Sequence, residues 1–218
     1  MSQDLEKIYA NRFSSREQQR TVLWDTLVTH HFQRYIGPHE TVLDLAAGYC
    51  EFINAIRCGR KIAIDLNPGV ERRAAADVEV HHTSSTTLPV DLEQQVDVVW
   101  ISNFLEHLDD KHELLATLRE VHRVLRPGGR VMVLQPNIRL TRGAYWDFVD
   151  HSLPITDRSL REALELTGFE VQLCKVRFLP YTTESRLPIS PLLIRAYLAL
   201  APAQLVLGKQ TFVIATRD

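Results

Sequence analysis

The stretch that decides the fold is Val42–Phe52, "VLDLAAGYCEF". It begins with an apolar run typical of a buried strand, continues into a turn of small residues with a single glycine, and then becomes helix-like. A strand, a tight turn and a helix in this order form a general device for binding nucleotides, because the free N–H groups at the start of the helix face the ligand. Loops that bind dinucleotides read G-x-G-x-x-G, since glycine lets the backbone approach the pyrophosphate closely.

On this chain the dinucleotide pattern falls on Ala46, Gly48 and Glu51, so only the central glycine is present and a carboxylate would face the pyrophosphate. The loop therefore suits a nucleoside ligand that has no phosphate. S-adenosylmethionine is such a ligand, with a carboxylate for the helix end and an adenosine that can rest on the turn. Alanine at position 46 is expected to keep a negative φ, because a Cβ atom disfavours the left-handed region.

A second acidic residue supports a ligand that contains ribose. The run "KIAIDLNP" places Asp65 at the end of the next strand, roughly 20 residues after the first one. A carboxylate at this point can accept hydrogen bonds from both ribose hydroxyls. Proteins that bind NAD share this feature, so Asp65 alone does not distinguish the two cofactors.

Short apolar runs alternate with helical patterns from Thr41 to Gln135, which is typical of a parallel sheet with helices on both faces. The clearest helix is expected at 111–125, where Leu residues and a valine form one apolar stripe and Asp110 with Glu113 forms a capping box. A later helix is expected to begin at Thr156 or Ser159 and to end before Gly168. The strand candidates are 41–45, 61–65, 96–102, 129–135, 169–176 and 210–217.

We therefore expect an α/β fold with a doubly wound, mostly parallel sheet of seven strands, the last of them antiparallel, in a single domain. Within residues 1–218, residues 1–40 would form a helical cap and residues 41–135 the half that binds a cofactor. Residues 136–218 would supply a substrate loop, an insertion and the final strands. The length of 218 residues, 45% of them hydrophobic, fits one core of this size.

Charge and composition exclude several classes of partner. With 25 Lys and Arg against 27 Asp and Glu, no overall basic field favours nucleic acid. Three unpatterned cysteines and an N-terminus without an apolar h-region favour a cytoplasmic protein. The longest apolar stretch is interrupted by Arg195 and Pro202, so stable membrane insertion is not expected. The oligomeric state is left open.

In combination, these motifs resemble the class I S-adenosylmethionine-dependent methyltransferases. The resemblance runs from about Val42 to the C-terminus and includes Asp65, "DVVWISNFLEHL" and "LREVHRVLRPGGRVMVLQPN". It implies S-adenosylmethionine as cofactor and methyl transfer to a small-molecule acceptor as the reaction. It also implies a set of cofactor contacts: Asp44, Ala46 and Gly48 near methionine and ribose, Asp65 and Leu66 at the ribose, Ser84 at the adenine amino group and Asn103 at the methionine amino group.

The acceptor side rests on two histidines and an aromatic loop. His107 follows the strand that faces the methyl group in the resembling family, and His151 lies on the loop after the fifth strand, so either is a candidate general base. Tyr145, Trp146 and Asp147 are candidates for holding the acceptor, since aromatic faces suit a sugar ring or a flat organic group. The alternatives are structural: a helix-start pair of Glu106 with His107, a loop pinned by His151, and aromatic side chains that fill the core. No metal site is expected, because no ligand spacing is recognisable.

Two questions stay open at this point. The apolar insertion at 178–208 has three interpretations: packing on the sheet as core, a lid over the acceptor, or an interfacial helix that contacts a membrane or a lipid-linked substrate. The function has two alternatives to methyl transfer, a Rossmann-type oxidoreductase and a non-catalytic module that binds S-adenosylmethionine. The acceptor itself, with a sugar or saccharide intermediate favoured by the aromatic loop, is not identified by the sequence.

Overall fold

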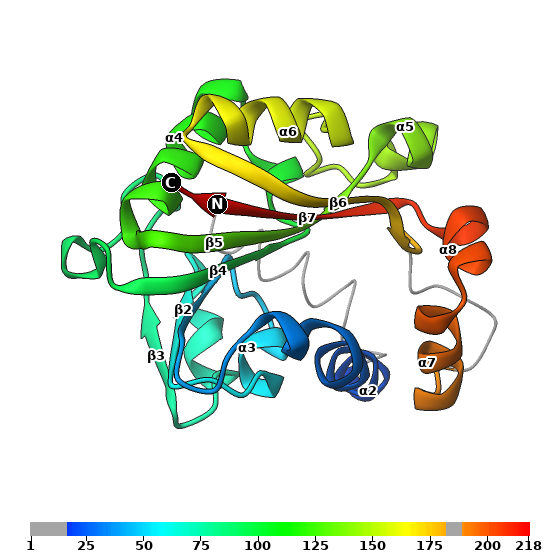
Figure 1. Cartoon of the computed structure of the whole chain (residues 1–218), viewed down its shortest axis with the longest axis horizontal. Coiled ribbons are helices and arrows are strands. Elements are labelled where there is room, and N and C mark those ends of the chain that lie inside the picture. The colour runs from blue at the N-terminus through cyan, green and yellow to red at the C-terminus, as the bar shows by residue number, and fades with distance from the viewer. Residues whose placement is uncertain (1–16, 182–188) are drawn as a thin grey trace.

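A computed structural model of the protein describes residues 17–181 and 189–218. Among these residues, seven strands form one sheet in the order β3-β2-β1-β4-β5-β7-β6, and β7 is antiparallel to both of its neighbours (Figure 1). The expected α/β fold with its antiparallel last strand is confirmed. The strands are β1 Thr41–Leu45, β2 Arg60–Ile64, β3 Val78–His81, β4 Val96–Ser102, β5 Leu125–Pro136, β6 Phe169–Leu179 and β7 Gln210–Arg217.

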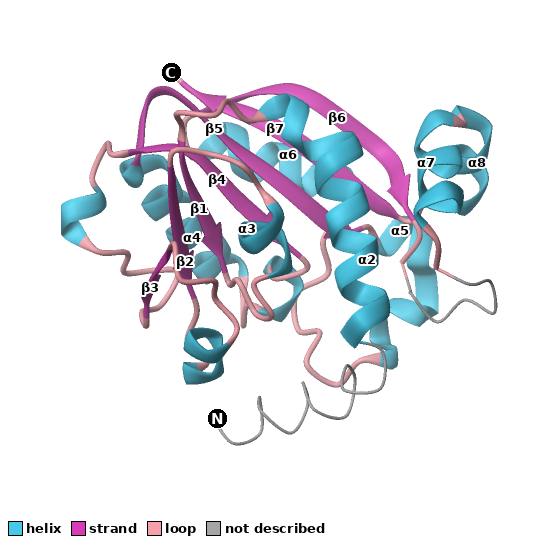
Figure 2. Cartoon of the chain, turned by 90° about the horizontal axis from the view of Figure 1, so that it is seen from below, coloured by secondary structure: helices cyan, strands magenta, loops and turns pink. Residues whose placement is uncertain are grey.

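Each face of the sheet has its own hydrophobic core because alternate residues of a strand point to opposite faces. On β4, Val99 and Ile101 pack against α4 (Lys111–Val124) and α6 (Asp157–Leu166). Val98 and Trp100 face the other way, toward α2 (Glu17–Leu27) and α3 (Glu51–Ala55). Figures 1 and 2 show these two helical layers with the sheet between them.

The core below the sheet is built around aromatic rings. Trp100 is fully buried, stacks on Phe52 with ring centroids 4.2 Å apart, and meets Phe32 at 4.7 Å. Phe32 belongs to the π-helical turn Val28–Phe32, which continues α2 and brings the predicted N-terminal cap onto the sheet. Residues 1–16 of that predicted cap lie outside the described residues. The rest of it packs as expected through its apolar side chains.

Helix caps follow the sequence with one difference. Thr156 caps α6, forms a capping box with Ser159, and Gly168 follows the helix with φ +89°. Asp110 caps α4 by accepting from the N–H groups of residues 112 and 113. Glu113 does not return this bond to Asp110; it accepts from the N–H of Asp109 at 2.8 Å, so the box is displaced by one residue.

The insertion forms two short helices, α7 (Pro191–Ala199) and α8 (Ala201–Leu207), while residues 182–188 lie outside the described part of the chain. Neither helix has a fully buried residue, so the interpretation of the insertion as sheet core is wrong for most of its length. Ile194, Tyr197 and Leu198 do pack against the lower core, and the Tyr197 hydroxyl donates to the Phe178 carbonyl at 2.7 Å. Within the described residues, no helix has the length and apolar character needed to cross a bilayer.

The glycine after α6 allows a test of the fold. At Gly168 an added Cβ would lie 2.9 Å from His122 Nε2 and would have to adopt φ +89°, so Gly168→Ala combines strain with a clash. We expect the free energy of unfolding to fall by about 2 kcal/mol. Urea denaturation measures this change.

The same substitution at two other glycines separates the effect of backbone strain from the effect of the clash. Gly128 has φ +75° but open space around its Cβ position, and Gly143 has open space without a positive φ. Gly128→Ala should therefore lower stability by about 1 kcal/mol, and Gly143→Ala should leave it unchanged or slightly raised. Equal losses in all three variants would contradict the explanation.

Candidate active site

The first loop, which follows β1, has a backbone that alternates between ordinary and left-handed residues. Ala46, Gly48 and Cys50 have φ values of 58°, 53° and 58°. The expectation of a negative φ at Ala46 is wrong: alanine occupies the left-handed region at a cost on the order of 1 kcal/mol. The helix α3 that follows has only five residues, so its N-terminus offers less to a ligand carboxylate than the sequence suggested.

Asp65 holds this loop from the neighbouring strand. Its Oδ2 atom accepts from the Gly48 N–H at 2.8 Å, and its Oδ1 atom accepts from the Asn67 N–H at 2.7 Å. The Ala47 N–H adds a bond to the Ile64 carbonyl at 3.1 Å. Because each carboxylate oxygen accepts about two hydrogen bonds, Asp65 keeps acceptor capacity for ribose hydroxyls while it shapes the loop.

Asp44 lies beneath the same loop at the end of β1 and is 3% exposed. Burial first, and the nearby Asp65 charge second, raise the pKa of Asp44 well above its ordinary value. Burial also raises the pKa of Asp65, against the two backbone N–H bonds that favour its charged form. The charge of Asp65 and the burial of both carboxylates disfavour a second negative charge on Asp44, which creates a preference for a cation.

The other predicted cofactor contacts lie on loops beyond the strand ends. Asn103 follows β4, is exposed and has φ +48°, a conformation held by its N–H bond to the Leu134 carbonyl at 2.9 Å. Ser84 accepts from the Thr86 N–H at 3.3 Å and shares a hydroxyl bond with Thr86 at 2.9 Å. Leu66 is 63% exposed and so has surface to offer an adenosine.

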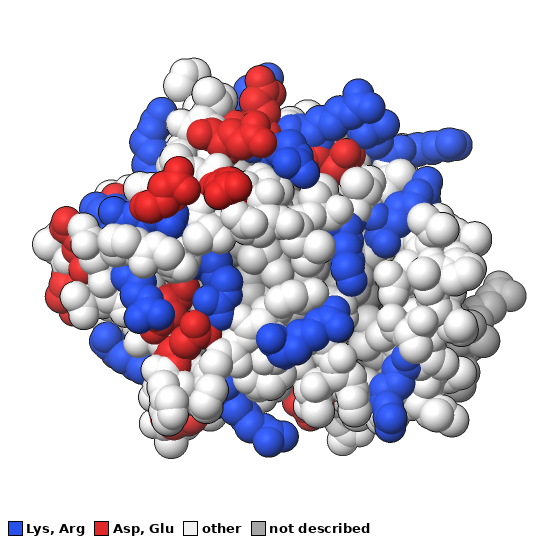
Figure 3. Space-filling view, viewed as in Figure 1, with Lys and Arg blue, Asp and Glu red and all other residues white. Residues whose placement is uncertain are grey.

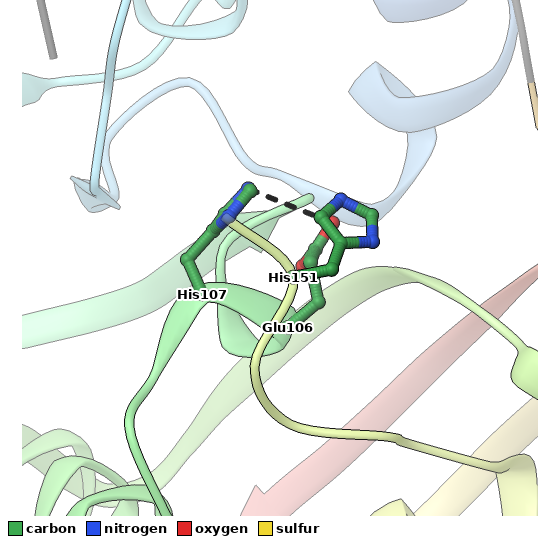
Figure 4. Close-up of side chains that lie close together, drawn as sticks. All are labelled: Glu106, His107 and His151. Carbon is green, nitrogen blue, oxygen red and sulfur yellow. Dashed lines mark ion pairs between the residues drawn. The ribbon is translucent and has the colours of Figure 1, made fainter. Parts of the chain in front are cut away.

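A cluster of Glu106, His107 and His151 forms the second part of the site (Figure 4). Glu106 and His107 belong to a 3-10 turn just after β4, and His151 comes from the loop after β5. One ligand atom of each side chain lies within 4.8 Å of the others. The sequence named both histidines as candidate bases, and the structure brings them together, with ring centroids 5.0 Å apart.

Backbone bonds join the two segments of the cluster. The Glu106 carbonyl accepts from the N–H groups of Ser152 and Leu153 at 2.9 and 3.1 Å. The Glu106 carboxylate accepts from Gln135 Nε2 at 2.8 Å, and its burial raises its pKa. The fixed position of the loop relative to β4 therefore depends on Glu106, which the sequence suggested only as a partner at a helix start.

His107 has a defined orientation. Its Nδ1 atom lies 3.0 Å from the Asp150 carbonyl and 3.4 Å from an Asp150 carboxylate oxygen. A carbonyl only accepts, so Nδ1 carries the hydrogen and the neutral ring has its lone pair on Nε2. Nε2 lies 4.0 Å from Glu106 Oε1, too far for a hydrogen bond. The His107 side chain is 29% exposed, so the ring is partly accessible to a reactant.

Two side chains of the aromatic loop pack against His151. Tyr145 is fully buried, donates to the Leu153 carbonyl at 2.5 Å and meets the His151 ring edge-on at 4.9 Å. This corrects its predicted role in holding the acceptor. Phe148, which the sequence did not single out, stacks on His151 at 5.1 Å. Trp146 is 51% exposed, and Asp147 is also exposed, so both are accessible to an acceptor.

Polar residues at the end of β5 fix the start of this loop before α5 (Ile138–Thr141). Asn137 Nδ2 donates to Asp157 at 2.8 Å and to the Thr211 hydroxyl at 3.1 Å. Arg139 pairs with the same Asp157 carboxylate at 3.0 Å. Gln135 and Asn137 were not named from the sequence; polar residues at the end of an otherwise apolar strand were the available signal.

A cavity of about 500 Å³ opens on the outer side of the first loop, between α2 and α3. Tyr49 lines it, with the Arg73 guanidinium 3.6 Å from the ring centroid, and Arg20 forms a two-pronged ion pair with Glu51. None of the predicted cofactor contacts lines this cavity. The carboxylates and histidines described above therefore remain the better candidate site.

Comparison with known proteins finds methyltransferases among the similar sequences and structures. Residues 43–133 match the family described as "Methyltransferase domain". A Mycolicibacterium smegmatis protein named a probable S-adenosylmethionine-dependent methyltransferase is 30% identical over 155 residues, which cover 62% of this chain and 58% of that protein. A demethylmenaquinone methyltransferase of Clavibacter sepedonicus is 33% identical over 134 residues, or 56% of this chain and 52% of that one.

The chain thus spans a little over half the length of the curated relatives it matches. The crystal structure of an S-adenosylmethionine-dependent methyltransferase from Archaeoglobus fulgidus superposes with a TM-score of 0.66 at 19% identity and covers 94% of this chain and 99% of its own. At that identity the likeness concerns the fold. The domain match over residues 43–133 and the related sequences support a class I S-adenosylmethionine-dependent methyltransferase, and the structural likeness shows that the chain has the fold of that class.

Proposed function

We propose that this protein transfers the methyl group of S-adenosylmethionine to a hydroxyl of a small-molecule acceptor, with His107 as the general base. The observation that carries the proposal is the arrangement of Asp44 and Asp65 around the Gly48 loop, at the same edge of the sheet as the His107 turn. Parallel strands bring their carboxyl ends to one edge, where ligands of such folds bind.

The cofactor is a cation, and this supports the assignment of the carboxylates. The sulfonium and ammonium groups of S-adenosylmethionine would relieve the repulsion between Asp44 and Asp65. Asp65 would hold the ribose, with Ala46 and Gly48 beneath it and Leu66 beside it. Asn103 would contact the methionine amino group. Ser84 would accept from the adenine amino group with one hydroxyl, a weaker acceptor than a carboxylate.

The reaction is an in-line displacement in which positioning supplies much of the rate. S-adenosylmethionine would supply the methyl group, and its transfer to the acceptor oxygen would break the sulfur–methyl bond and leave a neutral thioether. The proton of the hydroxyl passes to His107 Nε2, since Asp150 holds the hydrogen on Nδ1. His151, mostly buried under Phe148, would serve as the second candidate base or hold Glu106 in place.

The acceptor would rest against the exposed Trp146 ring and hydrogen-bond to Asp147. An aromatic face suits a sugar ring, which favours a saccharide intermediate, and it equally suits a flat ring such as the one that the name of the demethylmenaquinone methyltransferases indicates. The free cysteines Cys50, Cys58 and Cys174 support a reaction in the reducing cytoplasm.

The same cluster supports a second mechanism. Glu106, His107 and His151 offer two imidazole nitrogens and one carboxylate oxygen within 4.8 Å of one another, a donor set that suits a divalent transition metal. A cation held there would lower the pKa of a bound hydroxyl instead of leaving the proton to a histidine. Metal analysis of the purified protein distinguishes the two mechanisms independently of turnover.

The cofactor assignment is tested by thermal shift. S-adenosylmethionine and S-adenosylhomocysteine should both raise the melting temperature, and NADH should not. Asp65→Ala should lower the affinity for both adenosine compounds by about ten-fold or more, because hydroxyl bonds to a carboxylate are lost. Asp91→Ala, which removes an exposed carboxylate elsewhere, is the control. Stabilisation by NADH alone would favour an oxidoreductase.

Asp44→Asn should make the protein more stable and bind S-adenosylmethionine less well. Because the folded-state pKa of Asp44 is raised, the stability that protonated Asp44 provides is fully present below its ordinary pKa of about 4 and is lost as pH rises through the folded-state pKa. Asparagine does not ionise, so the variant keeps this stability as the pH rises. We expect the variant to match the wild type near pH 4 and to exceed it at pH 8 by on the order of 1 kcal/mol in unfolding free energy.

Chemical denaturation across this pH range measures the difference, with Asp91→Asn as the matched control. If the wild type and Asp44→Asn show parallel stability curves from pH 4 to 8, Asp44 ionises normally and the proposed preference for a cation loses its basis.

The general base is tested once mass spectrometry of cell extract incubated with methyl-labelled cofactor has identified the acceptor. His107→Ala should lower kcat by about 10²–10⁴-fold while cofactor affinity stays nearly unchanged. Asp150→Asn should cause a smaller loss. His112→Ala removes a histidine whose side chain is 97% exposed and should have no effect.

Three other outcomes have defined meanings. Full turnover in His107→Ala and His151→Ala would leave positioning as the whole explanation. Loss of turnover with a chelator, recovery with added Mn²⁺ or Zn²⁺, and stoichiometric metal in the purified protein would favour the metal mechanism. Cofactor binding without transfer to any acceptor would indicate the non-catalytic module.

A further inference from the structure

Helices α7 and α8 expose a concentrated apolar surface. Of the twelve large hydrophobic side chains that are exposed in the described residues, six lie on these helices and the joint between them, so they form a patch rather than the usual scatter. We call them the α7–α8 ridge. The ridge consists of Leu192, Leu193, Leu200, Leu205, Val206 and Leu207, with exposures of 48% to 75%.

Helices α7 and α8 are anchored to the rest of the protein on the side opposite the ridge. Ser190 caps α7, and the opposite side of that helix packs against the lower core through Tyr197 and its neighbours. Gln204 Nε2 on α8 donates to the Leu198 carbonyl at 3.0 Å, which ties the second helix to the first. The apolar side chains are therefore presented outward by a packed structure.

The described segments immediately before and after the ridge in the sequence carry only basic charges. Residues 171–181 and 189–217 contain no Asp or Glu, but they contain Lys175, Arg177, Arg195 and Lys209. Lys175 and Arg177 line a hollow with Leu205 on α8. In Figure 3 the side of the molecule that α7 and α8 occupy is mostly uncharged, with blue side chains beside it and no red ones.

The combination of exposed aliphatic side chains with basic residues favours one class of binding partner. A two-fold contact with a second copy would bring the basic residues of both copies together, which is unfavourable. Nucleic acid would match the basic residues but not six exposed aliphatic side chains. An anionic bilayer matches both, because aliphatic side chains enter the boundary between headgroups and acyl chains while Lys and Arg meet the phosphates.

We propose that the α7–α8 ridge docks this protein onto the surface of an anionic lipid bilayer. The helices lie in the interface, and Arg195 and Lys209 contact the headgroups. In Figures 1 and 2, α5, which opens the aromatic loop, lies at the same end of the sheet as α8, so docking brings that loop near the lipid. Docking itself does not depend on the reaction proposed above.

The test is flotation of the full chain with vesicles of phosphatidylcholine alone or with one quarter phosphatidylglycerol. We expect the bound fraction to rise by about five-fold or more with the anionic lipid and to fall in high salt. Leu205→Ser combined with Val206→Ser should abolish binding to both vesicles. Arg195→Glu combined with Lys209→Glu should remove the preference for phosphatidylglycerol.

Matched controls use exposed residues elsewhere. Val90→Ser and Leu166→Ser remove side chains that are 79% and 68% exposed, and Arg158→Glu reverses an exposed charge on α6; all three should bind like the wild type. Melting temperatures show whether each variant is folded. The proposal is overturned if the wild type stays unbound, or if controls and ridge variants lose binding equally. It is also overturned if the wild type does not bind vesicles and light scattering finds a dimer that dissociates when Leu205 and Val206 are changed.

Discussion

The hydrogen bond from the Gly48 N–H to the Asp65 carboxylate joins the loops that follow two neighbouring strands, β1 and β2. It fixes the left-handed turn at Gly48 and at the same time keeps Asp65 at the rim of the crevice. Since Asp65 also accepts from Asn67, the second loop is shaped by the same side chain. Removing this carboxylate would therefore alter both the conformation of the loop and the proposed ribose acceptor.

Sheet topology decides which strands can contribute to the site. The order β3-β2-β1-β4 reverses direction at β1, and ligands of doubly wound folds bind at such a switch point. Asp44 stands at the end of β1, and Asn103 follows β4, the neighbour on the other side. The cluster of Glu106, His107 and His151 then extends the site toward β5. The residues proposed to bind cofactor and acceptor thus lie along one edge of the sheet because of strand order.

Periodicity made most of the fold predictable. The alternation on β4, with Val98 and Trp100 on one face and Val99 and Ile101 on the other, reads directly as a strand with two buried sides. β3 was not placed, because its sequence "VEVH" is short and only half-buried at the sheet edge. The prediction that the insertion packs as core failed for a different reason. Apolar composition indicates burial only when a partner surface exists, and α7 and α8 have a partner surface on one side only.

The sequence named several residues of the candidate site but did not predict how they contact one another. Both histidines were named, yet their meeting depends on backbone bonds from Ser152 and Leu153 to the Glu106 carbonyl, and no pattern of side chains encodes these. Tyr145 was assigned to the acceptor because aromatic residues on loops often bind ligands. Its hydroxyl instead satisfies the Leu153 carbonyl, a demand that arises only once the loop is folded.

The binding loop lowers the stability of the free protein. Ala46 and Cys50 occupy left-handed conformations that favour glycine, and burial disfavours the charged form of Asp44. Glycine at positions 46 and 50 would remove this strain. It would also give the unfolded chain more conformational freedom and leave the loop less ordered before binding. A cationic ligand offsets the cost of the buried Asp44 charge directly, since ionised Asp44 and Asp65 then face positive charge. Affinity and unliganded stability therefore oppose each other at this loop, and the Asp65–Gly48 bond keeps the strained turn in place until a ligand arrives.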